Sequence, residues 1–259
     1  MNDDADVIRF LLQSDNRTDV LQLLRENEEL DRYEIEEELD ASRRTVIRTM
    51  DAVTDYGYVA KNDDKYELTL LGSYIVDIYH ELISNVSVAQ RFEPFLTHMP
   101  ADKFDVDPRK LEDAELIVAN EASPYALVDR TLSLRQKTST IRHMSPIIEQ
   151  KSMNQLAQRL QREESLTGDA IISQSALDAC KNHSEYQNSY QRIVASDRVT
   201  LYVYPDTIPF MLSITEDMVA IGVAKDGRPF AQVLSDHPEV QVWAENTFEM
   251  YRNQSEAIT

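Results

Sequence analysis

Two arginines one helical turn apart, Arg44 and Arg48, lie in an acid-free segment of a strongly acidic chain. Every charged residue in the range 41–50 is an arginine, whereas the whole chain has 46 Asp and Glu against 26 Lys and Arg. Arginine can grip a phosphate or make a bidentate bond to guanine, and Thr45 between them can contact a base edge or a phosphate. The segment therefore has the chemistry of a nucleic-acid contact.

The elements around this segment follow the order of a winged helix-turn-helix domain. Asp31 and Glu34 have the spacing of a capping box, so a helix is predicted to begin there. Ser42 is expected to cap the next helix, and Gly57 is expected to end it. Alternating residues across the range 58–70 then predict a β-hairpin, the wing. Several independent signals in this order favour a DNA-reading module.

The helix after Ser42 should turn its basic residues outward. Its predicted inward face consists of Val46, Ile47, Met50, Val53 and Tyr56, which leaves Arg44 and Arg48 together on another face. The first turns of a recognition helix enter the major groove. The alternative is an ordinary solvated face, on which Asp51 and Asp55 pair with these arginines. The predicted DNA-binding residues are Ser42, Arg43, Arg44, Thr45, Arg48, Lys61 and Lys65.

A long helix is predicted after the wing, over 73–96, with Ser73 as its cap. Its apolar residues fall on one side, which is typical of a dimer strut. The alternative is packing against the C-terminal domain of the same chain. We expect three segments: a winged helix-turn-helix domain over 1–72, a connector and dimerisation helix over 73–100, and an α/β ligand-sensing or assembly domain over 101–259.

The C-terminal half alternates between short apolar strands and helices. Three strand–helix repeats predict an α/β sandwich, and the last strands, within 210–234, predict an antiparallel extension of its sheet. The first strand is expected at 115–119. Helices are expected from Pro124 to about Thr138, with Ser123 as the cap, and from Ser175 to about Tyr190. The predicted fold class is thus a two-domain chain of α+β and α/β type. It comprises an N-terminal winged helix-turn-helix, a connector helix and a C-terminal α/β sandwich with the character of a sensor domain.

Small ligands bind beyond the carboxyl ends of strands in open α/β sheets. Near the end of one predicted strand, Arg142 could neutralise an anionic effector and His143 could sense pH or donate a hydrogen bond. Both could equally be surface residues at a strand edge. The predicted ligand-binding residues are Ser123, Tyr125, Arg142, His143, Ser145 and Ser173.

We find no motif for catalysis, a metal or a cofactor. The sequence lacks a GxGxxG fingerprint, a phosphate loop, a GxSxG elbow and an HxK pair. Its C-terminal histidines are scattered, and the single Cys180 sits among apolar residues, where packing is the favoured role over that of a nucleophile. We therefore assign no catalytic residue, no metal ligand and no cofactor, and an enzyme with an unfamiliar site is the least favoured alternative.

The net charge of −20 is spread along the chain. This acid excess resembles that of proteins from salt-loving archaea, although a merely acidic protein of an ordinary cell is the alternative. The acidic N-terminus lacks the basic residues of a signal peptide, and no stretch is apolar enough for a membrane span. We expect a soluble cytoplasmic protein with no membrane partner.

Taken together, the motifs resemble those of archaeal, largely haloarchaeal, winged-helix regulators of the methanogenesis-regulator type. The matching stretches are IRFLLQSDNRTDVLQLL, ASRRTVIRTMDAV, YELTLLG, AELIVA, SPYALVDR, IRHMSP and LSDHPEVQVWAENTFEMYR. The resemblance implies a DNA-binding transcription factor with a sensor-like C-terminal domain and implies no catalytic residues. Relatives often carry His or Arg soon after the proline that matches Pro124, whereas this chain has Tyr125 and Ala126.

The sequence thus predicts a transcriptional regulator that binds double-stranded DNA as a homodimer and responds to a small-molecule effector of unspecified identity. Effector binding is expected to bias the angle between the two reading heads through the helix after Ser73. The alternative is a protein-interaction platform built on a winged helix that does not bind DNA.

Overall fold

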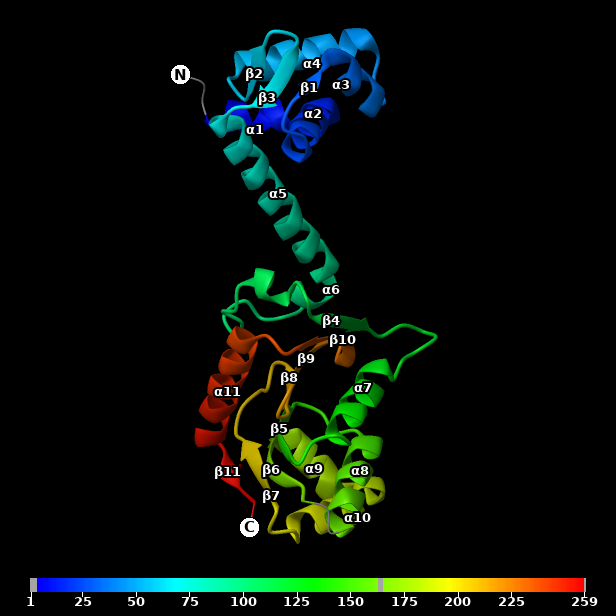
Figure 1. The fold of residues 1–259 in the computed structure, drawn as a ribbon. Helices are drawn as coiled ribbons and strands as arrows, with labels where there is room; N and C mark the ends of the chain where they lie inside the picture. Colours follow the sequence, from blue (N-terminus) through cyan, green and yellow to red (C-terminus); the bar gives the residue numbers. More distant parts are fainter. Residues whose placement is uncertain (1–3, 163–164, 259) are drawn as a thin grey trace. The chain divides into compact units, whose positions relative to one another are not determined.

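The computed structural model describes residues 4–162 and 165–258. The chain divides into two compact units, 1–86 and 87–259, which we call the first and the second unit. Helix α5 (Leu70–Arg91) begins in the first unit and ends in the second (Figure 1).

The first unit is a winged helix-turn-helix domain. A small antiparallel sheet, with strand order β1-β3-β2, closes a helical core. Its elements before α5 are α1 (Asp4–Leu12), α2 (Asp15–Glu26), β1 (Leu30–Asp31), α3 (Arg32–Glu38), α4 (Arg43–Asp55), β2 (Val59–Asn62) and β3 (Lys65–Leu68).

Local caps set the helix boundaries here, as the sequence predicts. The Asp31 carboxylate accepts the amides of Tyr33 at 2.7 Å and Glu34 at 3.0 Å, and the Glu34 side chain accepts the amide of Asp31 at 2.7 Å. The Ser42 hydroxyl accepts the amide of Thr45 at 3.3 Å. Gly57 follows α4 with φ of 75°, a conformation that strains other residues. The capping box and the two boundaries of α4 are therefore confirmed.

The junction between the wing and α5 differs from the expectation. The Thr69 hydroxyl accepts the amide of Gly72 at 3.0 Å and donates to the carbonyl of Gly57 at 2.6 Å, so Thr69 rather than Ser73 caps the helix. A Cβ on Gly72 would lie 1.9 Å from the carbonyl oxygen of Tyr58, which explains the glycine at this close approach. The helix also ends at Arg91, because Pro94 lies in the first turn of a separate short helix, α6 (Glu93–Leu96).

The second unit is an α/β sandwich around an eight-stranded mixed sheet. The strand order is β11-β7-β6-β5-β8-β9-β10-β4, with β5, β6 and β7 parallel and the remaining pairs antiparallel. After α6 its elements are η1 (Pro108–Leu111), β4 (Glu115–Val118), α7 (Ala126–Arg135), β5 (Thr140–Ser145), α8 (Gln150–Gln161), β6 (Thr167–Ser173), α9 (Gln174–Asn182), α10 (Ser184–Val194), β7 (Val199–Tyr204), β8 (Met211–Ile214), β9 (Val219–Lys225), β10 (Arg228–Ser235), α11 (Pro238–Asn253) and β11 (Glu256–Ala257).

Helices cover both faces of this sheet. Figure 1 shows α11 on one side and α7, α8, α9 and α10 on the other. The α11 face holds the largest apolar core, to which Met144 and Ile171 contribute, while Ile141 and Ile172 of the same strands pack on the opposite side. Alternate residues of a strand point to opposite faces, so one strand supplies both layers.

Three sequence predictions for the second unit need correction. The helix expected to begin at Pro124 with Ser123 as its cap begins at Ala126, and Ser123 instead bonds back to Asn120. The helix expected from Ser175 to Tyr190 is split at His183 into α9 and α10. The first predicted strand, β4, pairs only with β10 at the far edge of the sheet, so it is not part of the parallel set.

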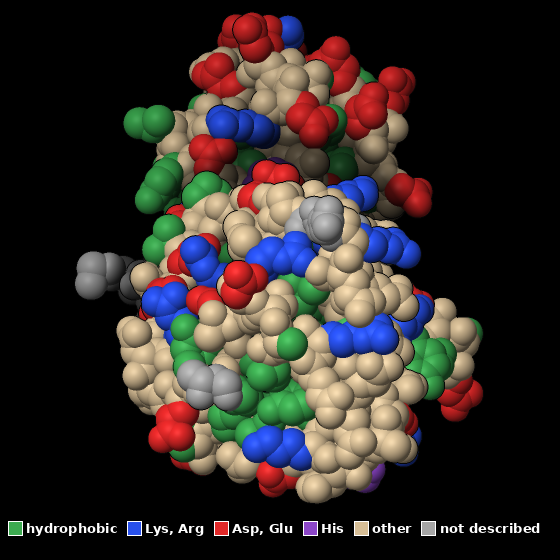
Figure 2. All heavy atoms as spheres, turned by 90° about the horizontal axis from the view of Figure 1, so that it is seen from below, with side chains coloured by type: hydrophobic (Ala, Val, Ile, Leu, Met, Phe, Trp, Pro, Cys, Tyr) green, Lys and Arg blue, Asp and Glu red, His purple; other side chains and the backbone are tan. Residues whose placement is uncertain are grey.

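On the face shown in Figure 2, basic groups lie scattered among acidic and uncharged ones. Several ion pairs between exposed side chains, such as Arg25–Asp77 at 2.8 Å and Arg130–Glu115 at 2.7 Å, contribute to this pattern.

Candidate functional site

The outward face of α4 carries the residues that the sequence places at a DNA contact. Val46, Met50 and Val53 are buried in the core of the first unit, and this burial fixes the orientation of the helix. Ser42, Arg43, Arg44 and Arg48 are exposed as a result, and Thr45 is half-buried with its hydroxyl 2.9 Å from that of Ser42. The structure thus brings these five predicted residues together on the first two turns.

Arg44 and Arg48 have no hydrogen-bond or ion-pair partner among the residues that the structure describes. In particular, neither guanidinium pairs with Asp51 or Asp55, the partners that the solvated-face alternative requires. Both groups are therefore available to an external anion.

The other predicted cations are engaged within the unit. The Nε atom of Arg43 lies 3.8 Å from a carboxylate oxygen of Glu36, which also pairs with Arg32. Lys61 lies over the ring of Tyr66, 5.4 Å from its centroid. Lys65 forms an ion pair with Glu29, which raises the pKa of the lysine by hydrogen bonding and attraction.

One residue of the recognition helix departs from the predicted pattern. Ile47, expected to face inward, is 38 % exposed and lies one turn from both the start of the helix and Met50. Ile47 lies three residues after Arg44 and one before Arg48. Its apolar side chain is therefore exposed beside the two free guanidinium groups.

The predicted ligand-binding residues do not form one cluster. Ser123 and Tyr125 are exposed in the segment before α7. Arg142 and His143 lie on opposite faces of the sheet: Arg142 pairs with Glu245 of α11, whereas His143 faces α7 and α8. The two neighbouring residues therefore face different surroundings on the two sides of the sheet.

The two predicted serines at strand ends serve local structure. Ser145 donates to the backbone carbonyl of Ile147 at 2.7 Å. Ser173 donates to the carbonyl of Pro146 at 2.8 Å and caps α9 by accepting the amide of Ala176. Of the six predicted ligand residues, only His143 and Ser145 line the cavity described next.

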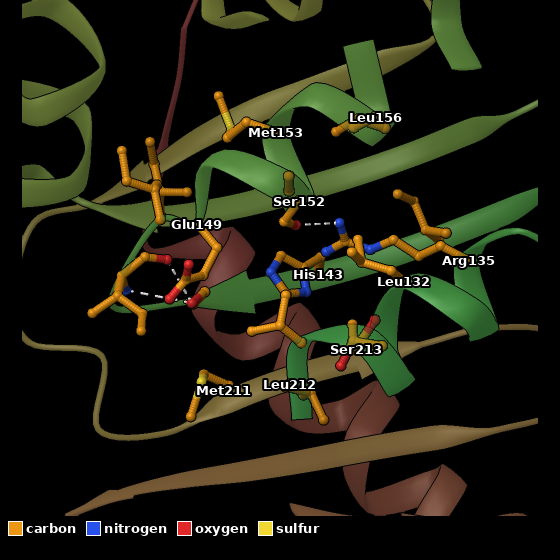
Figure 3. Close-up of a pocket in the computed structure, with 18 of the residues that line it drawn as sticks. Leu132, Arg135, His143, Glu149, Ser152, Met153, Leu156, Met211, Leu212 and Ser213 are labelled. Carbon is orange, nitrogen blue, oxygen red and sulfur yellow. Dashed lines mark hydrogen bonds between the residues drawn. The ribbon is translucent and has the colours of Figure 1, made fainter. Parts of the chain in front are cut away.

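A cavity of about 90 Å³ lies between the sheet and the helices α7 to α10 (Figure 3). Its lining is mostly apolar, with polar side chains from several elements. Arg135, Ser213 and Gln232, which the sequence analysis missed, supply buried polar groups there. In the sequence, the only indication that Arg135 is buried is the leucine next to it in the range 126–135. A leucine beside an arginine is also common on exposed helices, so this indication is ambiguous without the fold.

Burial shifts the pKa values of the ionisable groups in this cavity. Desolvation, with repulsion from Arg159, lowers the pKa of Arg135 to about 10, so the guanidinium stays charged at neutral pH. Desolvation and the nearby Arg135 hold the pKa of His143 well below its usual value, against a backbone hydrogen bond to Leu212. Burial also raises the pKa of Glu149 and of the Cys180 thiol, and the protonated, buried thiol fits a packing role.

Neither a metal cluster nor a membrane span emerges from the described parts of the chain. Within 4–162 and 165–258, no three His, Cys, Asp or Glu side chains are grouped to hold a metal ion. No helix in those ranges is long and apolar enough to cross a membrane.

Two solved structures resemble the chain only loosely. TrmBL2, described as an archaeal chromatin protein with a novel mode of DNA binding, is 11% identical with a TM-score of 0.44, over 98% of this chain and 99% of its own. NucT from Helicobacter pylori is 10% identical with a TM-score of 0.43, over 56% of this chain and 98% of its own. No curated protein matches the sequence. These likenesses carry no functional argument.

Fold and sequence together define the class, a winged helix-turn-helix protein with a C-terminal α/β domain. Residues 5–91 match the family described as HVO_A0261 N-terminal domain. Residues 124–254, half of the chain, match the family described as methanogenesis regulatory protein FilR1, middle domain. The chain therefore belongs to the methanogenesis regulatory protein family, and the resemblance noted from its motifs is confirmed.

Proposed function

We propose that this protein is a transcriptional regulator that binds double-stranded DNA through α4 of its first unit. The observation that supports this most strongly is the pair Arg44 and Arg48, exposed on the first turns of α4 and without a partner among the described residues. Unpaired guanidinium groups on the helix that follows a short turn suit the major groove.

The interface has a graded set of contacts. Arg44 and Arg48 supply the principal bonds to guanine or phosphate, and Ile47 can touch a thymine methyl group. Arg43, Lys61 and Lys65 must loosen their contacts with Glu36, Tyr66 and Glu29 before they reach phosphate. They contribute less than the free pair for this reason. Ser42 and Thr45 position the start of the helix, where a phosphate can also be held.

The acidic charge fits binding in a salty cytoplasm. At about 1 M salt the Debye length is about 3 Å, so acids that face away from the DNA repel it weakly. Counterion release contributes little to affinity in such a solution, so short-range bonds from a few arginines must provide most of it.

We further propose a homodimer formed through α5. Its exposed large apolar residues recur at helical spacing: Leu71, Tyr74, Ile78, Leu82, Ile83 and Val86. Two copies related by a two-fold axis would present two α4 helices to the half-sites of a palindrome. An effector bound in the second unit would change DNA affinity through α5, the helix that the two units share.

Selection from a random duplex pool with the full-length protein at high KCl tests the proposed function. Enrichment of a palindromic site, with two half-sites a helical turn or more apart, is the expected result. Recovery of a pool with no enriched sequence, at every KCl concentration tried, would contradict it.

A protein-interaction platform is the second candidate, and the wing favours it. Asp63 and Asp64 form the turn between β2 and β3, and Lys65 is paired with Glu29, so the wing tip offers phosphate no net positive charge. Absence of duplex binding, together with capture of one defined protein by the first unit's surface, would support this candidate instead.

A further inference from the structure

The cavity of the second unit concentrates buried polar atoms that no other group satisfies. Seven buried side-chain nitrogen or oxygen atoms lack a hydrogen-bond partner in the described ranges, and four of them line this cavity. These four are Arg135 Nε, His143 Nδ1, Ser213 Oγ and Gln232 Oε1. A buried polar atom left without a hydrogen bond destabilises the fold, so four such atoms lining one cavity point to a polar guest.

Arg135 specifies the charge of that guest. Arg135 is buried, with an exposed fraction of 3 %. Its Nη1 donates to the Ser152 hydroxyl at 2.6 Å (Figure 3). No carboxylate among the described residues pairs with it; its charged neighbour is Arg159, whose guanidinium bonds to the carbonyl of Arg135. A buried charge requires a counter-charge. The guest therefore carries a negative group.

The amount of charge is limited by the rest of the lining. Apart from Arg135 and the carboxyl of Glu149, whose pKa burial raises, the walls are chiefly aliphatic side chains such as Leu132, Ile141, Leu156 and Ile172. A dianionic phosphate would keep one charge unmatched in this setting, whereas a carboxylate matches a single guanidinium in charge and shape. The aliphatic walls also suit a carbon chain.

Two of the free atoms are acceptors, which adds a second requirement. The Thr131 hydroxyl donates to the carbonyl of Leu127 at 3.0 Å, so it must accept from Gln232 Nε2 at 2.9 Å, and this leaves Gln232 Oε1 as a free acceptor. The neutral His143 ring bonds the Leu212 backbone through its other nitrogen, so its Nδ1 is an acceptor too. A guest that satisfies them must donate hydrogen bonds.

The sheet brings His143 and Ser213 next to each other, whereas Gln232 lies farther across it, beyond β9. His143 of β5 and Ser213 of β8 are paired directly across neighbouring strands, and Gln232 comes from β10 on the same face. In Figure 3 the Arg135 side chain extends toward the His143 ring, and Ser213 lies below the two in this view. Donors and acceptors thus face the same space from α7, β5, β8 and β10.

We infer that this cavity binds a small hydroxycarboxylate, whose carboxylate accepts from Arg135 and Ser213 and whose hydroxyl donates to His143. The inference rests on the proposed sensing role of the second unit and names the class of effector. It does not depend on DNA binding, because ligand binding to the full-length protein is measured in a separate experiment without DNA.

Calorimetric titration of the full-length protein with glycolate, lactate, 2-hydroxybutyrate and 3-hydroxybutyrate tests the inference. At least one should bind. We then compare the hydroxycarboxylate that binds with two analogues, one without the hydroxyl, such as butyrate, and one without the carboxylate, such as 1,3-butanediol. Each analogue should bind at least about tenfold more weakly, because it would leave a buried polar group of the cavity without a hydrogen bond. No binding by any of the four, or equal binding by the analogues, would overturn it.

Variants locate the site. Arg135→Met should abolish binding, and Ser213→Ala should weaken it several-fold while changing little else in the fold. Arg142→Met is the matched control, because it removes an arginine from the opposite face of the same sheet and should leave affinity unchanged. Binding that survives Ser213→Ala and Arg135→Met alike, or a crystal structure at saturating ligand with only water at these atoms, would refute the assignment.

Discussion

At the scale of single residues, the account depends on which side chains are already satisfied. Arg44 and Arg48 are free among the described residues, whereas Arg43 and Lys65 have carboxylate partners within the first unit. Charge counted along the sequence cannot make this distinction, because Asp51 and Asp55 have a spacing that would allow them to quench the free pair. Only the orientation of the side chains separates a contact surface from a neutralised one.

The Ser42 cap allows a direct test of how α4 is held. Ser42→Ala removes the hydroxyl that accepts the Thr45 amide, and we expect the free energy of unfolding to fall by about 1 kcal/mol. Ser14→Ala is the matched control, since Ser14 precedes α2 without a side-chain capping bond and should change stability very little. Urea titrations followed by circular dichroism measure both, and equal effects of the two variants would contradict the assignment.

Glu216 makes stability depend on pH in a predictable direction. Hydrogen bonds from Ser139 and Thr138, with others from Thr140, lower the pKa of this carboxyl from 4.5 to about 2. A lowered pKa in the folded state stabilises the protein fully above about pH 4.5, and the contribution is lost as the pH falls toward 2.

Glu216→Gln should therefore lower the unfolding temperature at neutral pH, and the difference from the parent should shrink between pH 4.5 and 2. The neighbouring Asp217→Asn removes one exposed carboxylate and serves as the control. Thermal melts across this pH range provide the measurement. A difference that stays constant with pH would show that the carboxylate's charge is not what stabilises the contact.

At the scale of elements, α5 exposes several large apolar side chains that no other part of the same chain covers among the described residues. Ile78 and Leu82, one turn apart, are among its exposed apolar residues. We expect Ile78→Asp combined with Leu82→Asp to shift the protein from dimer to monomer, because two charges would be buried in the interface. Light scattering after size-exclusion chromatography reports the mass directly.

The control for this experiment lies on another side of the same helix. Ser84→Asp adds a charge at an exposed position on a side of the helix away from Ile78, Leu82 and Val86 and should leave the dimer intact. A monomeric parent protein, or dissociation by the Ser84 substitution as well, would rule out the α5 interface.

Elements whose signals are local could be predicted from the sequence. The capping box at Asp31 and Glu34, the Ser42 cap and the Gly57 stop each depend on residues within one turn, and all three are confirmed. The two-residue strand β1 escaped prediction because it is too short to show any alternation and exists only through its pairing with β3. Thr69 was missed as a cap because Ser73, four residues later, has the same chemistry.

The cavity was predictable only in part, for a reason of topology. Arg135, Ser213 and Gln232 lie on three different elements, and they line one cavity because β8, followed by β9 and β10, inserts beside β5 in the sheet. Nothing local in the sequence announces that insertion. The separation of Arg142 from His143, in contrast, follows from the two-residue period of any strand and could have been foreseen.

At the scale of the whole molecule, two units with different chemistry share one chain. The first unit presents free arginines to a partner, and the second encloses a charged cavity between its sheet and helices. The chain carries a net charge of −20, so we expect each proposed function to depend on a few unpaired cations rather than on a broad basic surface. Membership of a regulatory protein family is consistent with the proposal that the chain couples DNA binding to effector sensing.

The affinity of the full-length protein for its selected duplex at high KCl tests the central claim most directly. Arg44→Ala combined with Arg48→Ala should weaken binding at least about tenfold, since each arginine contact contributes about 1–3 kcal/mol. Lys137→Ala combined with Arg228→Ala, which removes two exposed cations from the second unit, should leave affinity nearly unchanged. Equal affinity of the parent and the Arg44 and Arg48 double variant would contradict the account.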